Sequence, residues 1–296
     1  MSKRDNTDSC AELLKAWLAR RASAETLAWL DAQLVKISTG DKRALFVAFG
    51  VAPRKTGKDD LSLSDDEMAS ASETRPGWTP QQWTVDQAAR TLLVLSFPAD
   101  DAQAYVATLD ELFRAGEVSE LVALYQALPL LPHPESHVWR TTEGIRTNIK
   151  AVFCAVVHDN PYPSEQLDEE RWNQMVLKCL FVGAALDPVI GLDERSNPEL
   201  ARMLVDFAHE RWAASRDVCP ELWRPVGLHA DQTALADLKR ALDDGTPIER
   251  QAVALALASC PQPEAKNILS AAPELVEQIQ SGEITWSGVA ADCYGS

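Results

Sequence analysis

The sequence predicts an all-α protein made of stacked helical hairpins in a solenoid-like arrangement. Apolar residues recur at the three- and four-residue spacing of one helix face along most of the 296-residue chain. Helix caps and short connectors separate these segments, and no stretch shows the two-residue alternation of a half-buried strand. A short turn at Gly245 joins two of the helices into a pair of the HEAT type.

Residues 1–53 are expected to form a group of N-terminal helices. Ser9 and Glu12 have the spacing of a capping box, which begins the first helix. Ser23 is placed to cap the second helix. Gly40 then ends that helix before a third, shorter one.

Residues 54–78 are expected to form an acidic, flexible loop. The segment combines Gly57 with clustered aspartates and serines and has little apolar periodicity. Leu61, Leu63 and Met68 are available to fold onto a partner, but a tolerated surface insertion is the favoured interpretation. Because such a loop makes few buried contacts, its deletion is expected to leave the melting temperature within a few degrees.

Residues 79–230 are expected to form a central helical body that holds the candidate site. The predicted helix starts in this body are Thr84, Pro98, Ser119, Ser136, Asp168 and Asn197. The helix from Ser136 is expected to be long, because its apolar stripe continues through Ile149 to Val156. The helices from Ser136, Asp168 and Asn197 must pack their stripes together, so a pocket is expected between them.

Residues 231–281 are expected to form HEAT-like helices, and residues 282–296 a loosely ordered tail. Gly245 ends one helix, and Glu249 completes the capping box of the next. A single pair of this kind cannot bury both of its faces, so it should stack on the preceding helices. Trp286 lies in the tail and is available to dock back onto the body.

The apolar content of 46% is sufficient for a substantial core in a chain of this length. The apolar helix faces supply the residues expected in that core, which are Trp17, Leu30, Leu92, Leu112, Ile149, Phe153, Val176, Leu180, Leu204, Phe207 and Leu255.

The charge and the cysteine pattern narrow the classes of partner and compartment. Asp and Glu number 44 against 28 Lys and Arg, which gives a net charge of −16. Such an excess repels phosphate backbones and anionic lipid, so neither nucleic-acid binding nor polybasic membrane attachment is expected. No window approaches the ~18 consecutive apolar residues of a membrane span, so direct membrane insertion is not expected. Six scattered cysteines and a polar N-terminus favour a cytoplasmic location.

The common signatures of catalysis and cofactor binding do not occur in the sequence. There is no dinucleotide-binding glycine motif, P-loop, serine-hydrolase elbow or H-E-x-x-H, so no cofactor, metal site or catalytic residue is predicted. His133 and His137 have the spacing of a metal pair, but Pro134 between them favours a loop that enters a helix. Cys154 and His158 have the spacing of a nucleophile and its base, but a thiol on an apolar helix face is more often structural.

Polar residues at helix ends in the central region form the candidate ligand site. Arg146 and Lys150 repeat a positive charge one turn apart in an acidic protein, which requires acidic neighbours or an anionic ligand. A buried ion-pair network that fixes the order of the helices is the alternative to a binding site. The residues expected to share one region are Arg146, Asn148, His158, Asn160, Lys178, Asp193, Arg195 and His209.

The chain resembles the EboA-type proteins of the bacterial ebo gene cluster. The strings that carry the resemblance are 144–148, 158–163, 172–178, 191–201 and 209–212, within a region from about Trp83 to Leu257. The resemblance implies a pathway that makes or moves a small metabolite. It also implies neighbouring products similar to a UbiA-type prenyltransferase, a sugar-phosphate cyclase and metal-dependent hydrolases. No catalytic residue set accompanies the resemblance, so none is carried over.

Two functions from different classes are consistent with these observations. The first is a non-catalytic helical scaffold or carrier in secondary metabolism, which binds a small metabolite or partner pathway proteins, membrane-associated ones included. The alternative is an enzyme of unrecognised type that acts on a small anionic or polar metabolite. Convergence of the polar residues in one closed cavity would favour ligand binding or catalysis, and their scattering would favour a scaffold.

Overall fold

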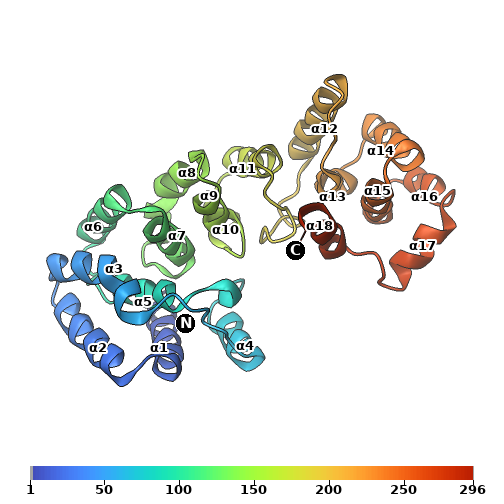
Figure 1. Cartoon of the computed structure of the whole chain (residues 1–296). Helices are drawn as coiled ribbons and strands as arrows, with labels where there is room; N and C mark the ends of the chain where they lie inside the picture. Colours follow the sequence, from blue (N-terminus) through green and yellow to red (C-terminus); the bar gives the residue numbers. More distant parts are fainter. Residues whose placement is uncertain (1–2, 296) are drawn as a thin grey trace. The chain divides into compact units, whose positions relative to one another are not determined.

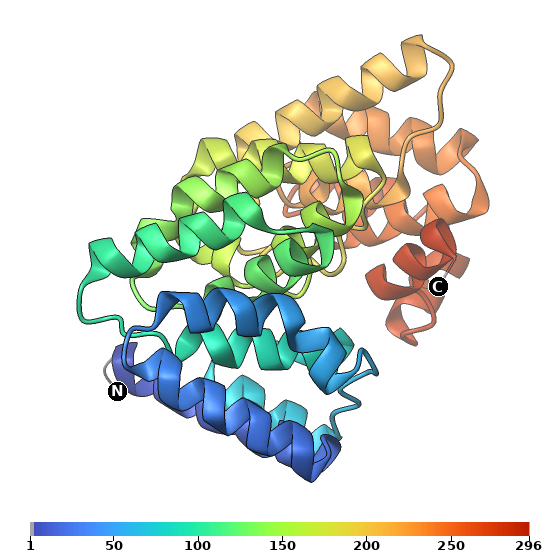
Figure 2. The same ribbon diagram turned by 60° about the vertical axis from the view of Figure 1, so that its left-hand side comes forward.

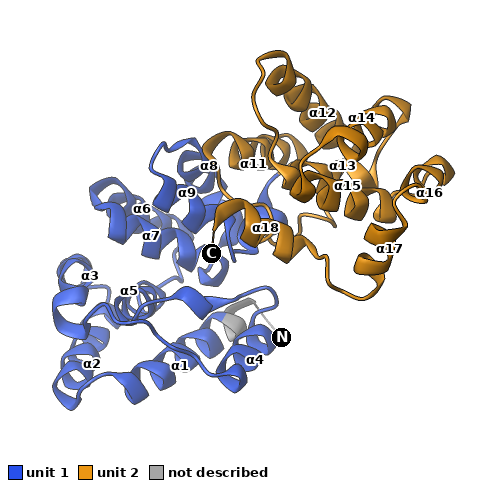
Figure 3. Cartoon of the chain, turned by 45° about the vertical axis from the view of Figure 1, so that its right-hand side comes forward, with its two compact units in different colours: residues 1–167 blue, residues 168–296 orange. Residues whose placement is uncertain are grey.

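The computed structural model describes residues 3–295, and over that range the chain is all-α, which confirms the predicted fold class. Within the described residues, extended backbone pairs only in an isolated bridge between Asp60 and Thr84. The chain divides into two compact units, residues 1–167 and residues 168–296 (Figure 3). This division falls inside the central body expected over residues 79–230.

Unit 1 is made of helices that pack around α5 (Figures 1 and 2). Helix α5 contacts α1, α3 and α7, and α7 in turn packs on α9. The α-helices of the unit are α1 (Lys3–Arg21), α2 (Ala24–Ser38), α3 (Lys42–Thr56), α4 (Asp65–Thr74), α5 (Val85–Leu95), α6 (Ala102–Ala115), α7 (Val118–Ala127), α8 (Val138–Arg146), α9 (Lys150–Val157) and α10 (Tyr162–Gln166). Its 3-10 turns are η1 (Pro80–Gln82), η2 (Leu128–Leu130) and η3 (Pro134–His137).

A buried ion pair ties α5 to its neighbours. The Arg90 side chain is 2% exposed, and its Nη1 donates to Asp86 Oδ2 at 2.8 Å one turn earlier on the same helix. Its Nε donates to the Phe49 carbonyl of α3 at 3.1 Å, and Nη1 also reaches the Ser119 carbonyl of α7 at 3.4 Å. Burial lowers the pKa of Arg90, and Asp86 opposes that shift. The Arg90 guanidinium therefore donates hydrogen bonds to acceptors on three helices.

The segment 54–78 is not the flexible loop that its composition predicts. Ser64 and Glu67 form a capping box that begins α4, so an acidic stretch with small residues is helical here. Leu61 is fully buried, and its backbone N–H donates to the Trp83 carbonyl at 2.7 Å. The segment therefore makes buried contacts, and the premise on which its dispensability was predicted is wrong.

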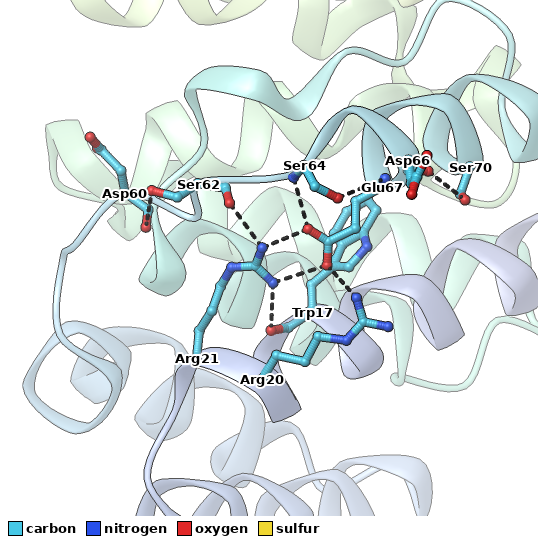
Figure 4. A network of polar contacts seen from close by, with 9 residues as sticks. All are labelled: Trp17, Arg20, Arg21, Asp60, Ser62, Ser64, Asp66, Glu67 and Ser70. Atoms are coloured by element: carbon cyan, nitrogen blue, oxygen red, sulfur yellow. Dashed lines mark hydrogen bonds and ion pairs between the residues drawn. The ribbon is translucent and has the colours of Figure 1, made fainter.

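Charged side chains hold α4 against α1 (Figure 4). Glu67 accepts hydrogen bonds from Arg20 at 2.8 Å and from Arg21 at 3.2 and 2.6 Å. The Trp17 ring of α1 also lies 5.3 Å, between centroids, from the ring of Trp78, which follows α4 in the chain, and both rings are buried. Glu67 of this segment thus has two specific partners on the first helix.

The long helix expected from Ser136 to Val156 is broken in two. Helix α8 ends at Arg146, and α9 begins at Lys150. Thr147 has extended backbone, and its Oγ1 accepts a hydrogen bond from the Ile149 N–H at 3.2 Å. A threonine hydroxyl bonded to its local backbone competes with the helical hydrogen bond, which accounts for the break. Ile149, predicted in the core, lies at the break and is 44% exposed.

Unit 2 is made of helices that pack around α15 (Figure 1). Helix α15 contacts α13, α14, α16 and α18, and the α14–α15 pair turns at Gly245 as expected. The α-helices of the unit are α11 (Glu169–Val182), α12 (Pro198–Ala213), α13 (Trp223–Leu228), α14 (Gln232–Asp244), α15 (Pro247–Ser259), α16 (Pro263–Leu269), α17 (Pro273–Gln280) and α18 (Trp286–Tyr294), with the 3-10 turn η4 (Pro220–Leu222).

Two features of unit 2 depart from a generic helical pair. A Cβ on Gly227 of α13 would lie 2.5 Å from the Ala256 carbonyl oxygen of α15, so the two backbones cross where only glycine fits. The expected loose tail is instead α18, whose N-cap Thr285 accepts from the Gly288 N–H at 3.1 Å. Trp286 does dock back, because the Arg224 guanidinium lies over its ring at 5.8 Å from the centroid.

The predicted core is largely confirmed. The residues found buried are Trp17, Leu30, Leu92, Leu112, Phe153, Val176, Leu180 and Leu204. Besides Ile149, Phe207 and Leu255 are the exceptions, and both are half-buried. None of the helices over residues 3–295 combines the length and the apolar character needed to cross a bilayer.

Candidate functional site

Unit 1 contains a groove with a volume of about 1100 Å³. One wall is the N-terminal half of α1, and a second is the C-terminal end of α2. The remaining walls are the connector 96–100 after α5, the segment 129–135, and the end of α10. Connectors rather than helix interiors therefore form much of the lining.

Prolines stiffen the segment 129–135 that lines the groove. Pro129, Pro132 and Pro134 fix their own φ angles and restrict the residues before them. His133 has φ 57°, in the left-handed region that residues other than glycine seldom adopt. The Tyr162 hydroxyl of α10 donates to the Pro134 carbonyl and anchors the far end. The lining segment is therefore held in one conformation.

An arginine–carboxylate pair joins three parts of the groove wall. Arg75 donates to both carboxylate oxygens of Glu165 on α10, at 2.8 and 2.5 Å. Its Nε donates to the Pro129 carbonyl at 2.9 Å. The Arg75 side chain is 14% exposed and Glu165 is 37% exposed. The bidentate pair thus positions the wall while one edge of the carboxylate faces solvent.

Two histidines frame the buried ring of Tyr105 beside the groove. The His133 and His137 rings lie 6.2 and 6.4 Å from the Tyr105 centroid, both in edge-on geometry. His133 Nε2 is 2.8 Å from the Ala99 carbonyl, and His137 Nε2 is 3.0 Å from the Pro132 carbonyl. Burial lowers the pKa of His137, so its imidazole is neutral at pH 7. Each histidine ring therefore forms a hydrogen bond with a backbone carbonyl in a connector that lines the groove.

The groove combines an apolar surface with an acidic rim. The apolar side chains that line it include Leu34, Val35, Leu95, Phe97, Leu130 and Leu131. Four acidic side chains, Asp8, Asp100, Glu135 and Glu165, line it against two basic ones, Lys15 and Arg75. Burial raises the pKa of the Cys10 thiol in the lining to about 11, and Arg75 opposes that shift. The thiol is thus protonated at pH 7 and serves as an apolar surface, so the arrangement suits non-covalent binding.

The eight residues predicted from the sequence lie elsewhere, and none of them lines this groove. Arg146, Asn148, His158 and Asn160 belong to unit 1, and Lys178, Asp193, Arg195 and His209 belong to unit 2. Within the described residues no group of three or more His, Cys, Asp or Glu side chains is arranged to hold a metal ion.

Three of the four predicted residues in unit 1 are wholly or partly exposed. Arg146 forms an ion pair with Glu143 at 2.7 Å, and its guanidinium lies 5.8 Å from the centroid of the exposed Trp139 ring. Asn148 is exposed in the break between α8 and α9, and His158 is half-buried at the C-cap of α9. Burial raises the pKa of the Cys154 thiol, which argues against an activated nucleophile beside His158.

Asn160, the fourth predicted residue in unit 1, is a buried structural anchor. Its side chain donates to the Tyr125 carbonyl at 3.0 Å and to the Ala155 carbonyl at 3.2 Å. Its Oδ1 accepts from the Tyr162 N–H at 3.0 Å. The residue is 2% exposed and joins α7, α9 and α10, so it supports the element that carries Glu165 rather than contacting a ligand.

In unit 2 the predicted residues make contacts with different partners. Asp193 accepts from Arg224 at 2.8 and 2.9 Å, and the Arg195 guanidinium lies 4.8 Å from the centroid of the buried Trp172 ring. His209 Nε2 is 2.7 Å from Asp237 Oδ2. Desolvation lowers the pKa of the half-buried Lys178.

A buried carboxylate in unit 2 was missed by sequence reasoning. Glu221 is 1% exposed and accepts from the Leu186 N–H at 2.9 Å and the Asp187 N–H at 2.8 Å. Burial raises the pKa of Glu221, and these two hydrogen bonds oppose the shift. Arg224 donates to Asp187 at 2.8 Å as well as to Asp193. The cluster fixes the connector 184–193. The one signal in the sequence that could have indicated it is the charged Glu221 directly after Pro220, at the start of a turn.

Comparisons with known proteins identify a family relationship for most of the chain. The family model described as metabolite traffic protein EboA matches residues 10–227. The matched range contains all eight predicted residues and the groove lining except Thr7 and Asp8. Neither the comparison with curated proteins nor the comparison with solved structures gave a match.

Proposed function

The chain belongs to the EboA family, and from that premise we propose that unit 1 carries a small metabolite, bound non-covalently in its groove. The description of the family as metabolite traffic proteins supports a role in moving rather than converting a molecule. We further propose that the protein delivers this molecule to other proteins of its pathway, as a carrier or scaffold.

The groove itself is the observation that carries the proposal. Its volume of about 1100 Å³ is slightly above the usual range for small-molecule sites, which is roughly 300–1,000 Å³. A lining that is apolar with a few polar groups is typical of such sites. The stiff proline segment and the Arg75–Glu165 pair favour a preformed site, which lowers the entropic cost of binding.

The electrostatics favour a neutral or cationic molecule with an apolar part. Acidic side chains outnumber basic ones in the lining, and both amino groups of the Arg75 guanidinium already donate to Glu165. A multiply anionic ligand would meet repulsion there. The groove thus favours a neutral or cationic ligand, whereas the charges of Arg146 and Lys150 indicate an anionic one.

Mass spectrometry of the protein purified from cells of its own species tests the proposal. We expect a small molecule to remain bound under native conditions and to be released on denaturation. Val35 lines the groove and is 68% exposed, so Val35→Arg should place a long charged side chain there with little effect on folding. Val47 is 56% exposed and lies outside the lining, so Val47→Arg is the matched control.

The two variants should differ in bound ligand and not in stability. Val35→Arg should lower occupancy at least tenfold, while Val47→Arg leaves it unchanged. Equal ligand occupancy in both variants would contradict binding in the groove. The released molecule should be the same before and after prolonged incubation with the protein. Its chemical conversion would favour the enzymatic alternative instead.

A further inference from the structure

An exposed tryptophan and two basic side chains occupy the surface of α8 and its junction with α9. Trp139 of α8 is 60% exposed, and the Arg146 guanidinium lies 5.8 Å from the centroid of its ring. Ile149, in the break between the two helices, is 44% exposed, and Lys150, the first residue of α9, is also exposed. These four residues form a surface that we call the Trp139 patch. None of them lines the groove of unit 1.

The backbone under the Trp139 patch is packed and hydrogen-bonded. Helix α8 packs on α9, and a Cβ on Gly144 would lie 2.7 Å from Val156 Cγ2, so the two helices are in close contact. In the break, the Ile149 N–H donates to Thr147 Oγ1 at 3.2 Å. The exposed side chains therefore stand on an ordered base, which lowers the entropic cost of binding a partner.

Trp139 and Arg146 belong to the residue types that contribute most to protein–protein binding. An exposed tryptophan gains much from being covered, because its ring carries a large apolar surface. The Arg146 side chain is 65% exposed, and its ion-pair partner Glu143 lies on the same helix. Such exposed pairs contribute little to stability, so a carboxylate of a partner can replace Glu143 at little cost. Arg146 thus differs from the buried arginines of this chain, which join separate elements.

The Trp139 patch is locally positive in a strongly acidic chain. Arg146 and Lys150 contribute two positive charges against one negative charge from Glu143, whereas the chain as a whole has a net charge of −16. An acidic partner is therefore repelled by the chain as a whole and attracted at this patch. This difference favours one docking position over the others.

We propose that the Trp139 patch docks an acidic segment of another protein. An apolar side chain of that segment covers the Trp139 ring and Ile149, and its carboxylates pair with Arg146 and Lys150. Because the patch is small, the contact belongs to the class of weak, transient interfaces. The proposal goes beyond binding in the groove and does not depend on it, because the two surfaces share no residue.

Two other occupants fit the charge of the patch less well. Anionic membranes are recruited by clusters of roughly four to eight basic residues, and the patch has two. A dimer with two-fold symmetry would place the same surface on both sides of the interface. Arg146 and Lys150 would then face the same residues of the second copy, and like charges facing each other repel. An acidic segment of a different protein meets neither objection.

Fluorescence anisotropy with a labelled peptide and the full chain tests the proposal. The probe is a short peptide rich in Asp and Glu with a pair of leucines at its centre, and its control carries Asn and Gln in place of the acids. We expect saturable binding of the acidic peptide, about tenfold tighter than that of the neutral one and weaker at high salt. Trp139→Ala should weaken this binding about tenfold, and Arg146→Gln about fivefold.

Two matched substitutions in unit 2 serve as controls. Phe181 is an aromatic residue that is 78% exposed, so Phe181→Ala removes a comparable ring from another surface. Arg202 is 61% exposed and pairs with Glu199 three residues earlier on its helix, as Arg146 pairs with Glu143. Phe181→Ala and Arg202→Gln should leave the affinity for the acidic peptide unchanged.

Flotation with phosphatidylserine vesicles and sedimentation equilibrium distinguish the other occupants. Vesicle binding or self-association that Trp139→Ala abolishes would overturn the proposal in favour of a membrane or a second copy. Absence of saturable binding of the acidic peptide would also overturn it, as would equal losses in Trp139→Ala and Phe181→Ala. If Trp139→Ala fails to fold, Arg146→Gln and the neutral peptide still decide the matter. The small molecule bound in the groove should be retained in Trp139→Ala, so the two proposals can fail separately.

Discussion

Replacing Glu67 by Gln removes one charge from the contact between α4 and α1 and leaves its shape intact. The carboxylate accepts from Arg20 and Arg21 and also from the Ser64 N–H at 2.9 Å. A glutamine amide oxygen can still accept the Ser64 bond, so the capping box survives. The substitution therefore isolates the charged interaction across the segment that composition alone predicts to be a loop.

The size of the effect follows from the perturbed carboxyl group. The hydrogen bond from Arg21 is the largest cause that lowers the pKa of Glu67, from 4.5 to about 2. At about 1.4 kcal/mol per unit, this shift corresponds to an upper value of about 3–4 kcal/mol. Arg20 is 66% exposed and contributes little, whereas Arg21 is only 18% exposed. We expect Glu67→Gln to lower the free energy of unfolding of unit 1 by about 2 kcal/mol at pH 7.

The pH dependence has a definite sign. A carboxyl group whose pKa is lower in the folded state stabilises that state fully above its unfolded value near 4.5. That contribution is lost as the pH falls from about 4.5 towards 2, where the folded group is protonated. The stability difference between wild type and Glu67→Gln should therefore be constant from pH 7 to 5 and shrink below pH 4.5.

Urea unfolding and amide hydrogen exchange of α4 measure this difference. Asp66→Asn is the matched control, because Asp66 is an exposed acid on the same first turn of α4. It should change the free energy of unfolding by less than about 0.5 kcal/mol. The reasoning is refuted if Glu67→Gln is as stable as Asp66→Asn at pH 7, or if its deficit persists unchanged at pH 3.

Three further substitutions test other contacts by urea unfolding at pH 7. Gly227→Ala should cost about 2–3 kcal/mol, because its Cβ would lie 2.5 Å from the Ala256 carbonyl oxygen; Gly50→Ala, with no atom nearer than 3.5 Å, should be neutral or stabilising. Asp86→Asn should cost about 3 kcal/mol, since it leaves the buried Arg90 charge with only the more distant Glu120 carboxylate, at 3.8 Å, as a partner. Asn160→Asp should cost about 2–3 kcal/mol, because a carboxylate cannot donate to the Tyr125 and Ala155 carbonyls, whereas the exposed Asn148→Asp should be nearly neutral. Equal losses at Gly227 and Gly50, equal losses at Asn160 and Asn148, or an unchanged stability of Asp86→Asn would contradict the corresponding contact.

Most helices could be predicted from the sequence because their signals are local. Spacing on one face and a capping residue were sufficient for α2, α11 and α12, whose predicted N-caps Ser23, Asp168 and Asn197 accept hydrogen bonds from the first turns of their helices. The prediction was wrong where a non-local contact or a competing local hydrogen bond determines whether a segment is helical. Helix α4 depends on two arginines more than 45 residues earlier in the chain, and composition gives no indication of them. The break at Thr147 depends on a hydroxyl that accepts a hydrogen bond from the Ile149 N–H, two residues later.

The groove was missed for a related reason. Its lining comes from proline-rich connectors and helix ends that are far apart in the sequence, and none of these pieces has a ligand-binding motif of its own. The prolines at 129, 132 and 134 were the available signal, because clustered prolines beside histidines indicate a stiff segment that can present side chains. The family strings directed attention instead to residues such as Asn160, whose specific sequence context reflects three buried hydrogen bonds.

The ion pairs that the arginines form explain why positive charge in the sequence was a poor guide to the ligand site. In an acidic chain each arginine has many possible carboxylate partners, so arginines are readily used to join elements. Arg75 joins three segments of the groove wall, Arg90 joins three helices, and Arg224 joins Asp187 to Asp193. Each of these guanidiniums already has carboxylate partners, so an incoming anion would have to displace them. A positive residue in this chain therefore indicates a structural ion pair first, and the class of the proposed ligand is better inferred from the side chains that line the groove.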